Sequence, residues 1–161
     1  MKQAHVSIHD RTVVDAALER AENTGAAAAA IELPDGKILT GKTSNLLGPS
    51  AALILNALKD LAGIDHNLHV ISPTAIEPIQ KVKTQYLGSK NPRLHIDEIL
   101  IALSISSAAN PAAQLAMEQL PKLKGCQVHT SVMLSSVDIK LFKKLGIQLT
   151  CEPKYEHNPI Y

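Results

Sequence analysis

The sequence predicts an α/β fold with three layers, in which a five-stranded mixed sheet lies between helices. Apolar residues repeat with helical spacing in some segments and form short strand-like runs in others, and the two kinds alternate. The turn sequence Pro34-Asp35-Gly36 joins two strand-like runs, which predicts a β-hairpin near the N-terminus. Later strand candidates are separated by helices, and such long crossovers are typical of parallel neighbours.

The first half of the chain predicts a helix, the hairpin and a buried helix. Gly25 ends the first helical pattern, and the apolar run of the next segment is strand-like up to the turn. After Pro49, apolar residues cover most of the helix circumference, which indicates a central, buried helix. The expected elements are a helix over 11–23, strands over 26–33 and 37–40, and a helix over 49–62.

The second half alternates between helices and short strands. Ser72-Pro73 is a cap followed by proline at the first helical position, and Thr74 with Glu77 forms an alternative capping box. Asn110-Pro111 repeats the cap-then-proline pattern. The expected elements are a strand over 68–71, helices over 72–87, 95–107 and 111–120, a strand over 126–134, a helix over 137–145 and a strand over 147–151.

Composition narrows the class of protein. The 161 residues suit one domain, and 16 basic against 15 acidic residues with 2% aromatics argue against nucleic-acid binding. No apolar run approaches a membrane span, and two cysteines do not form a disulfide framework. We therefore expect a cytoplasmic protein with no nucleic-acid or membrane partner.

The stretch 36–43, GKILTGKT, fits the phosphate-loop pattern of nucleotide-binding proteins. That motif requires a strand before the first glycine and a helix that begins at the lysine. Here Gly36 belongs to a turn, the four residues after it are strand-like, and Gly48-Pro49 would break a helix begun at Lys42. We predict that Gly41 ends a strand and that Lys42 is solvated.

Residue pairs with metal-ligand chemistry are few. His66 and His69 form one pair, and Cys126 and His129 form another, but the latter two would point to opposite faces of a strand. Four ligands at zinc spacing are absent from the sequence. We expect structural roles for both pairs, and neither a metal nor another cofactor.

Serines at 104, 106 and 107 would need a base nearby to act as nucleophiles. His95 lies a helix earlier, and no sequence pattern pairs it with them, so helix termination is the simpler interpretation. The polar, basic loop 90–93 is typical of a solvated loop, although it is also placed to reach over a ligand.

Polar residues follow the second hairpin strand and begin the next two predicted helices. If these helix starts meet at one edge of the sheet, they form an anion-friendly pocket of hydroxyls, an ammonium group and helix N-termini. The same residue types also serve simply as helix caps, which is the commoner role. The candidate ligand-binding residues are Lys42, Thr43, Ser44, Asn45, Ser50, Ser72 and Thr74.

The segment 25–63 resembles the opening of a cytidine-deaminase-like domain, where a helix, a hairpin and a buried helix precede a further strand and helix. The resemblance would place zinc ligands and a catalytic glutamate at 48–52 and 72–76. Those segments read GPSAA and SPTAI, so the zinc motifs are missing. The resemblance therefore implies the fold without zinc deamination.

At finer grain, the chain resembles the C-terminal segment of domain-of-unknown-function family 1846, a bacterial family of long proteins. The stretches that carry the resemblance are IELPDGKILTGKTSNLLG, LNALKDLAGI, GSKNPRLHIDEILIALSISSAANPAAQLAMEQLPKLKGC and KKLGIQLTCEP. The resemblance implies that residues 1–161 form a single α/β domain, either as part of a larger protein or as a stand-alone relative. It supplies no catalytic residue.

Three functions remain open from the sequence. The first is a non-catalytic domain that binds a small anionic or nucleotide-like ligand or mediates assembly. The second is an enzyme acting on a phosphorylated or nucleotide-like metabolite. The third is a protein–protein interaction module, through homo-oligomers or docking to other domains of a longer protein.

Overall fold

The structure, a computed structural model, describes residues 12–153. Helices and strands alternate along this part of the chain, with one π turn and one 3₁₀ turn among them. In order, the elements are α1 (Thr12–Thr24), β1 (Ala28–Glu32), β2 (Ile38–Lys42), α2 (Pro49–Leu61), α3 (Pro73–Lys81), π turn η3 (Val82–Tyr86), α4 (Ile96–Ser106), α5 (Pro111–Glu118), 3₁₀ turn η4 (Leu120–Leu123), β3 (Gln127–Thr130), α6 (Ser136–Lys144) and β4 (Gln148–Cys151).

The sheet is mixed, and residues 12–153 contribute four strands in the order β2-β1-β3-β4. β1 pairs antiparallel with both β2 and β3, whereas β3 and β4 are parallel and joined through α6. The expected β-hairpin is therefore present as β1 and β2. The α/β class predicted from the sequence is confirmed.

The predicted fifth strand, over 68–71, is wrong. Val70 and Ile71 are both buried, so successive side chains enter the core instead of alternating between two faces. Both outer strands of the sheet lie elsewhere in the chain, and residues 68–71 pair with neither. The deaminase-like layout, which needs a strand immediately before Ser72, is not confirmed.

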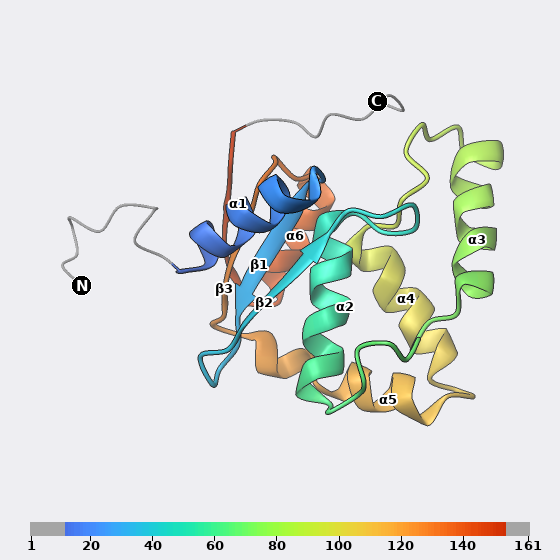
Figure 1. The fold of residues 1–161 in the computed structure, drawn as a ribbon. Helices are drawn as coiled ribbons and strands as arrows, with labels where there is room; N and C mark the ends of the chain where they lie inside the picture. Colours follow the sequence, from blue (N-terminus) through green and yellow to red (C-terminus); the bar gives the residue numbers. More distant parts are fainter. Residues whose placement is uncertain (1–11, 154–161) are drawn as a thin grey trace.

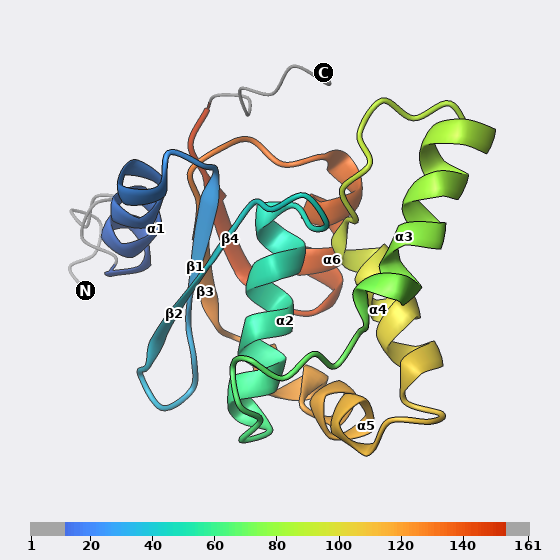
Figure 2. The ribbon, with the colours of Figure 1, turned by 45° about the vertical axis from the view of Figure 1, so that its right-hand side comes forward.

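Helices cover the two faces of the sheet unequally. α1 packs on one face, while α2 and α6 pack on the other with α4 and α5 behind them, and α3 is outermost (Figures 1 and 2). Ala29 and Ile31 of β1 face the larger helical side, and Ala30 faces α1. The predicted alanine-rich strand is thus the centre of the molecule, with both of its faces covered.

β2 and α2 approach each other closely at Gly41. A Cβ atom at this position would lie 2.5 Å from the backbone nitrogen of Leu53, so no larger residue fits without movement. Gly41 is in β2, and α2 begins only at Pro49. The strand–loop–helix context of a phosphate loop is therefore absent, as predicted.

Several predicted boundaries shift for local reasons. The helix expected over 72–87 contains Pro78 and changes to π geometry at Val82. The strand expected over 126–134 ends at Thr130. The Ser131 N–H still donates to the Ala28 carbonyl, but the Ala28 N–H donates to the Ser131 hydroxyl instead of to a backbone carbonyl, so the ladder stops there. The expected start of the first helix, Arg11, lies outside the described residues.

Candidate functional site

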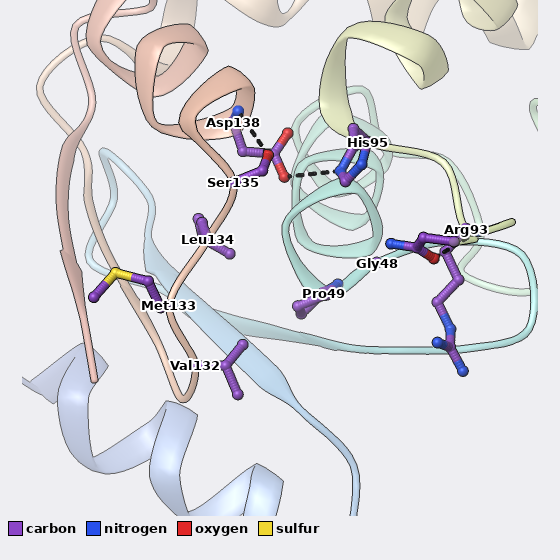
Figure 3. Close-up of a pocket in the computed structure, with 10 residues that line it drawn as sticks. Gly48, Pro49, Arg93, His95, Val132, Met133, Leu134, Ser135 and Asp138 are labelled. Atoms are coloured by element: carbon purple, nitrogen blue, oxygen red, sulfur yellow. Dashed lines mark hydrogen bonds and ion pairs between the residues drawn. The ribbon is translucent and has the colours of Figure 1, made fainter. Parts of the chain in front are cut away.

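A pocket of about 540 Å³ opens where α2, α4 and α6 begin. Each of these helices places its N-cap residue in the wall (Figure 3). The lining residues come from three separate segments, and they are Gly48, Pro49, Asn91, Arg93, His95, Val132, Met133, Leu134, Ser135 and Asp138. None of the helices alone forms the site, because its walls depend on the tertiary fold.

Backbone hydrogen bonds hold the starts of α2 and α4 side by side. The segment before α2 runs parallel to the segment before α4 through a bridge between Leu47 and Leu94. The Gly48 N–H donates to the Leu94 carbonyl at 3.1 Å, and the Leu94 N–H donates to the Leu46 carbonyl at 2.9 Å. Both helices therefore direct their N-termini toward the same region.

Asp138 connects α6 to this pair of helices. Its side chain is 7% exposed, and its Oδ1 accepts the Ile96 N–H, the first amide of α4, at 3.1 Å. Its own amide donates to the Ser135 hydroxyl at 3.3 Å, which caps α6. The carboxylate thus accepts from the start of α4 and lies in the first turn of α6, and at both places the helix dipole favours negative charge.

His95 forms an ion pair with the other oxygen of Asp138. Nδ1 lies 3.4 Å from Oδ2, and the imidazole is 31% exposed. The hydrogen bond to Asp138 raises the pKa of His95, and its effect exceeds the opposing effect of burial. Figure 3 shows the imidazole lying between Asp138 and the start of α4, with this pair forming one end of the pocket.

The α4 start is also anchored from its outer side. Glu98 Oε1 accepts the His95 N–H at 2.8 Å and the Lys83 ammonium at 2.9 Å. Lys83 is buried and belongs to the π turn η3, a geometry that is frequent at functional sites. Its ammonium also donates to the Arg93 carbonyl at 2.5 Å. The π turn therefore fixes the loop that forms the pocket rim.

Arg93 faces the rim rather than the His95–Asp138 pair. Its Nε donates to the Ser44 carbonyl at 2.6 Å, and Figure 3 shows the guanidinium turned away from His95. Arg93 Nη1 is buried and has no hydrogen-bond partner among residues 12–153. The loop 90–93, interpreted as a solvated loop that is also placed to reach over a ligand, contributes Asn91 and Arg93 to the pocket wall.

The opposite wall is apolar. Pro49 comes from α2, and Val132, Met133 and Leu134 come from the segment that leaves β3 toward α6 (Figure 3). The pocket therefore combines one polar end, formed by helix starts and an imidazole, with one apolar side. This combination is typical of sites for small organic molecules that carry a polar or charged group.

The sequence-predicted ligand residues are divided among different places. Thr43 and Ser50 are buried, and their hydroxyls have no hydrogen-bond partner among the described residues. Asn45 is an exposed loop residue whose carbonyl accepts from the Gln80 side chain at 2.9 Å. Lys42 and Ser44 line a separate groove of about 630 Å³ between β2 and α2.

Ser72 and Thr74 lie at the opposite end of α3. Gln80, which reaches Asn45, is eight residues after Ser72, equivalent to about 12 Å of helix. Ser72 instead caps its own helix by accepting the Thr74 N–H at 3.1 Å. The helix starts that meet α2 are those of α4 and α6, so the predicted convergence does not include α3.

Sequence analysis missed His95, Ser135 and Asp138 as site residues. His95 was weighed only against serines that lie at the far end of α4. A serine three residues before an aspartate at a predicted helix start was a weak signal for Ser135 and Asp138. Nothing in the sequence indicated that the aspartate would meet a histidine 43 residues earlier.

The two remaining pairs with metal-ligand chemistry, His66 with His69 and Cys126 with His129, belong to no metal-binding group among the described residues. His129 is buried, with Nδ1 2.6 Å from Thr150 Oγ1 and Nε2 2.8 Å from Glu152 Oε2. Burial raises the pKa of the Cys126 thiol. Residues 12–153 contain no group of three or more potential metal ligands. None of the helices in this range has both the length and the apolar character needed to cross a membrane.

These features define a small α/β domain with a mixed sheet and a pocket at three helix N-termini. Residues 9–161 match the model of the family described as "Domain of unknown function DUF1846, C-terminal", and the chain belongs to this family. It is 57% identical over its whole length to a UPF0371 protein of Corynebacterium efficiens and 48% identical to one of Streptococcus uberis. The chain covers 32% and 33% of these relatives, so it spans about a third of their length.

Proposed function

We propose that this domain binds a small anionic metabolite in the pocket between α2, α4 and α6. The observation that carries the proposal is the meeting of three helix N-termini at one cavity that also contains the His95–Asp138 pair. Each helix start carries about half a positive charge, which favours an anionic group. The role proposed is binding rather than chemistry.

The polar end supports an anion such as a phosphoryl group. Asp138 is already paired with an amide and with His95, so its charge is compensated within the protein. Because the pKa of His95 is raised by Asp138, the imidazolium form persists to higher pH and neutralises that carboxylate, which would otherwise repel an anion. No side chain of the described residues caps the start of α2. The Gly48 N–H donates to the Leu94 carbonyl and Pro49 has no N–H, so α2 contributes to this end mainly through the field of its dipole.

The apolar side supports an organic ligand rather than a bare ion. Pro49, Val132 and Leu134 provide a surface for a base, sugar edge or short acyl group. A volume of about 540 Å³ is within the range of small-molecule pockets. The proposed class is therefore a phosphorylated or nucleotide-like metabolite.

Binding is tested by thermal shift and calorimetry on dialysed protein, with inorganic phosphate, nucleoside monophosphates and sugar phosphates as probes. At one hundred times its dissociation constant, a ligand adds about 2.7 kcal/mol to the free energy of unfolding. We expect His95→Gln to weaken binding, and most strongly at about pH 6, where imidazole is protonated. Comparing variants at each pH cancels the titration of the phosphate itself.

The matched control is His69→Gln, because His69 is exposed and does not line the pocket. It should bind like the parent at every pH. Equal weakening by both histidine variants would place the anion elsewhere, and no stabilisation by any probe would contradict the proposal.

A second candidate function is acid–base catalysis, which the His95–Asp138 pair favours. A carboxylate that orients Nδ1 leaves the other imidazole nitrogen for proton transfer to a ligand. Compounds that bind would then also be converted. Asp138→Asn should lower turnover far more than affinity if this candidate holds, whereas binding without any conversion supports the first proposal.

A further inference from the structure

The α4–α5 hairpin carries an outer surface without charge. Residues 99–117 form 19 consecutive positions with no Asp, Glu, Lys or Arg, although 19% of the whole chain is charged. The segment includes most of α4 and nearly all of α5, which pack against each other. Packing against the core explains why the inner face of these helices is apolar. It does not explain why their outer face also lacks charged residues.

Large aliphatic side chains project from this outer face. Ile101 is 60% exposed, Ile105 is 71% exposed, and Leu115 of α5 is 48% exposed. Ile101 and Ile105 are one helical turn apart and share a face of α4. Ile99 and Leu103 on the inner face are already buried in the core, so the core does not need the outer residues. We call the exposed pair Ile101 and Ile105 of α4 the outer apolar patch.

The patch has the composition of an interface core. Such cores are depleted of charged residues, whereas ordinary protein surface is not. α4 lies between α2 and the outermost helix α3 (Figures 1 and 2), and the exposed fractions of Ile101 and Ile105 show that a partner has access to their side of α4. The contrast with the charged outer face of α6, which carries Lys140, Lys143 and Lys144, indicates a specific surface rather than a general lack of charge.

We propose that the outer apolar patch docks against the other two thirds of the full-length family protein. The family model that matches this chain describes the C-terminal domain of the family. The relatives are about three times longer than this chain. In such a chain the remaining segment is covalently tethered, so its effective concentration near the patch is high. A tethered partner therefore covers the patch more readily than a second, untethered copy.

Docking at this surface leaves the pocket open. Ile105 is ten residues beyond His95, which corresponds to about 15 Å along α4. The pocket is at the N-terminal end of α4, and the patch occupies its C-terminal half. The docked domain would thus hold α4 from outside while ligands retain access, and this inference does not depend on the proposed ligand.

The test uses the full-length Corynebacterium efficiens relative with its matching third replaced by this chain, beside the 161-residue chain alone. Hydrogen exchange over 99–117 is measured in both. We expect exchange in the full-length protein to be slower by about tenfold or more, since docking suppresses local opening. Equal exchange in the two proteins would overturn the proposal.

Substitutions then separate docking from folding. Ile101→Ser with Ile105→Ser should leave the isolated chain nearly unchanged, because both side chains are exposed, but should abolish the extra protection in the full-length protein. The control is Val137→Ser with Ile139→Ser, which alters exposed aliphatic residues of α6 outside the patch. The control should retain the protection.

Self-association provides the competing outcome. If the isolated chain is a dimer by light scattering and Ile101→Ser with Ile105→Ser makes it monomeric, a second copy occupies the patch and the proposal is wrong. If the full-length protein keeps its protection on dilution while the isolated chain is monomeric, the tethered partner is supported.

Discussion

The starts of α2 and α3 have similar sequences but differ in burial and in capping. Gly48-Pro49 and Ser72-Pro73 each place a small residue at the N-cap and proline at the first helical position. The α3 start is exposed, and the Ser72 hydroxyl accepts the Thr74 N–H. The α2 start is buried, lines the pocket and has no side-chain cap among the described residues.

This difference separates a structural helix cap from a helix start that is available to a ligand. The Ser72 hydroxyl accepts a free N–H group at the start of α3, so fewer N–H groups remain there for a ligand. Gly48 has no side chain, and its backbone is used to join α2 to the α4 segment. The same proline-containing pattern thus gives a side-chain-capped helix start at α3 and part of the pocket wall at α2.

The largest expected effect on stability comes from disturbing the close contact between β2 and α2 at Gly41. Gly41→Ala would place a Cβ 2.5 Å from the Leu53 nitrogen and 2.7 Å from its Cα, so β2 and α2 must separate. We expect a loss of about 1–3 kcal/mol in the free energy of unfolding, measured by urea denaturation.

Gly48→Ala is the matched control for this prediction. Its Cβ would lie 3.7 Å from the Leu94 carbonyl oxygen, which is ordinary van der Waals contact. Its φ of −70° is accessible to alanine. It should stay within about 1 kcal/mol of the parent. If Gly48→Ala were as harmful as Gly41→Ala, the close β2–α2 contact would not be what holds the α2 start.

A smaller effect is expected from removing the α3 cap. Ser72→Ala should cost about 1 kcal/mol and act on α3 alone, because the cap is exposed and local. Hydrogen exchange over 73–81 should accelerate about fivefold, while ligand binding in the pocket is unchanged. If Ser72→Ala lost ligand binding, the start of α3 would have to contribute to the ligand site.

The smallest expected effect is a pH dependence from His95. Its pKa is raised above the ordinary value of 6.5, so the folded state binds the proton more tightly than the unfolded state. The resulting stabilisation is full below about pH 6.5 and is lost as pH rises through the folded pKa.

Urea denaturation of the parent and of His95→Gln across this range measures the effect. The parent should lose free energy of unfolding relative to the variant as pH rises. Parallel curves for the two proteins would show that the Asp138 contact does not favour the protonated imidazole.

Local patterns explain why much of the fold was predictable. The hairpin turn Pro34-Asp35-Gly36, the proline-marked helix starts and the alternation of helices and strands each depend on residues close together in sequence. The caps of Ser72 and Asn110 are examples, since each accepts an amide two residues ahead. The sequence could also exclude the phosphate loop, because its context is local.

Tertiary contacts decided the rest. Residues 68–71 have a strand-like pattern, but strand formation needs an available neighbour, and they pair with no strand of the described sheet, although Val70 and Ile71 are buried. The three helix starts at the pocket meet through the Leu47–Leu94 bridge and through Asp138, neither of which leaves a periodic signal in the sequence.

The sequence by itself therefore determined the α/β class, the hairpin and most helix starts of this protein. Only the tertiary structure decided that His95 meets Asp138, that α4 and α6 rather than α3 join α2, and that Ile101 and Ile105 face outward. The physical reason is that backbone propensity and capping act over a few residues, whereas pockets and surfaces depend on which distant segments pack together.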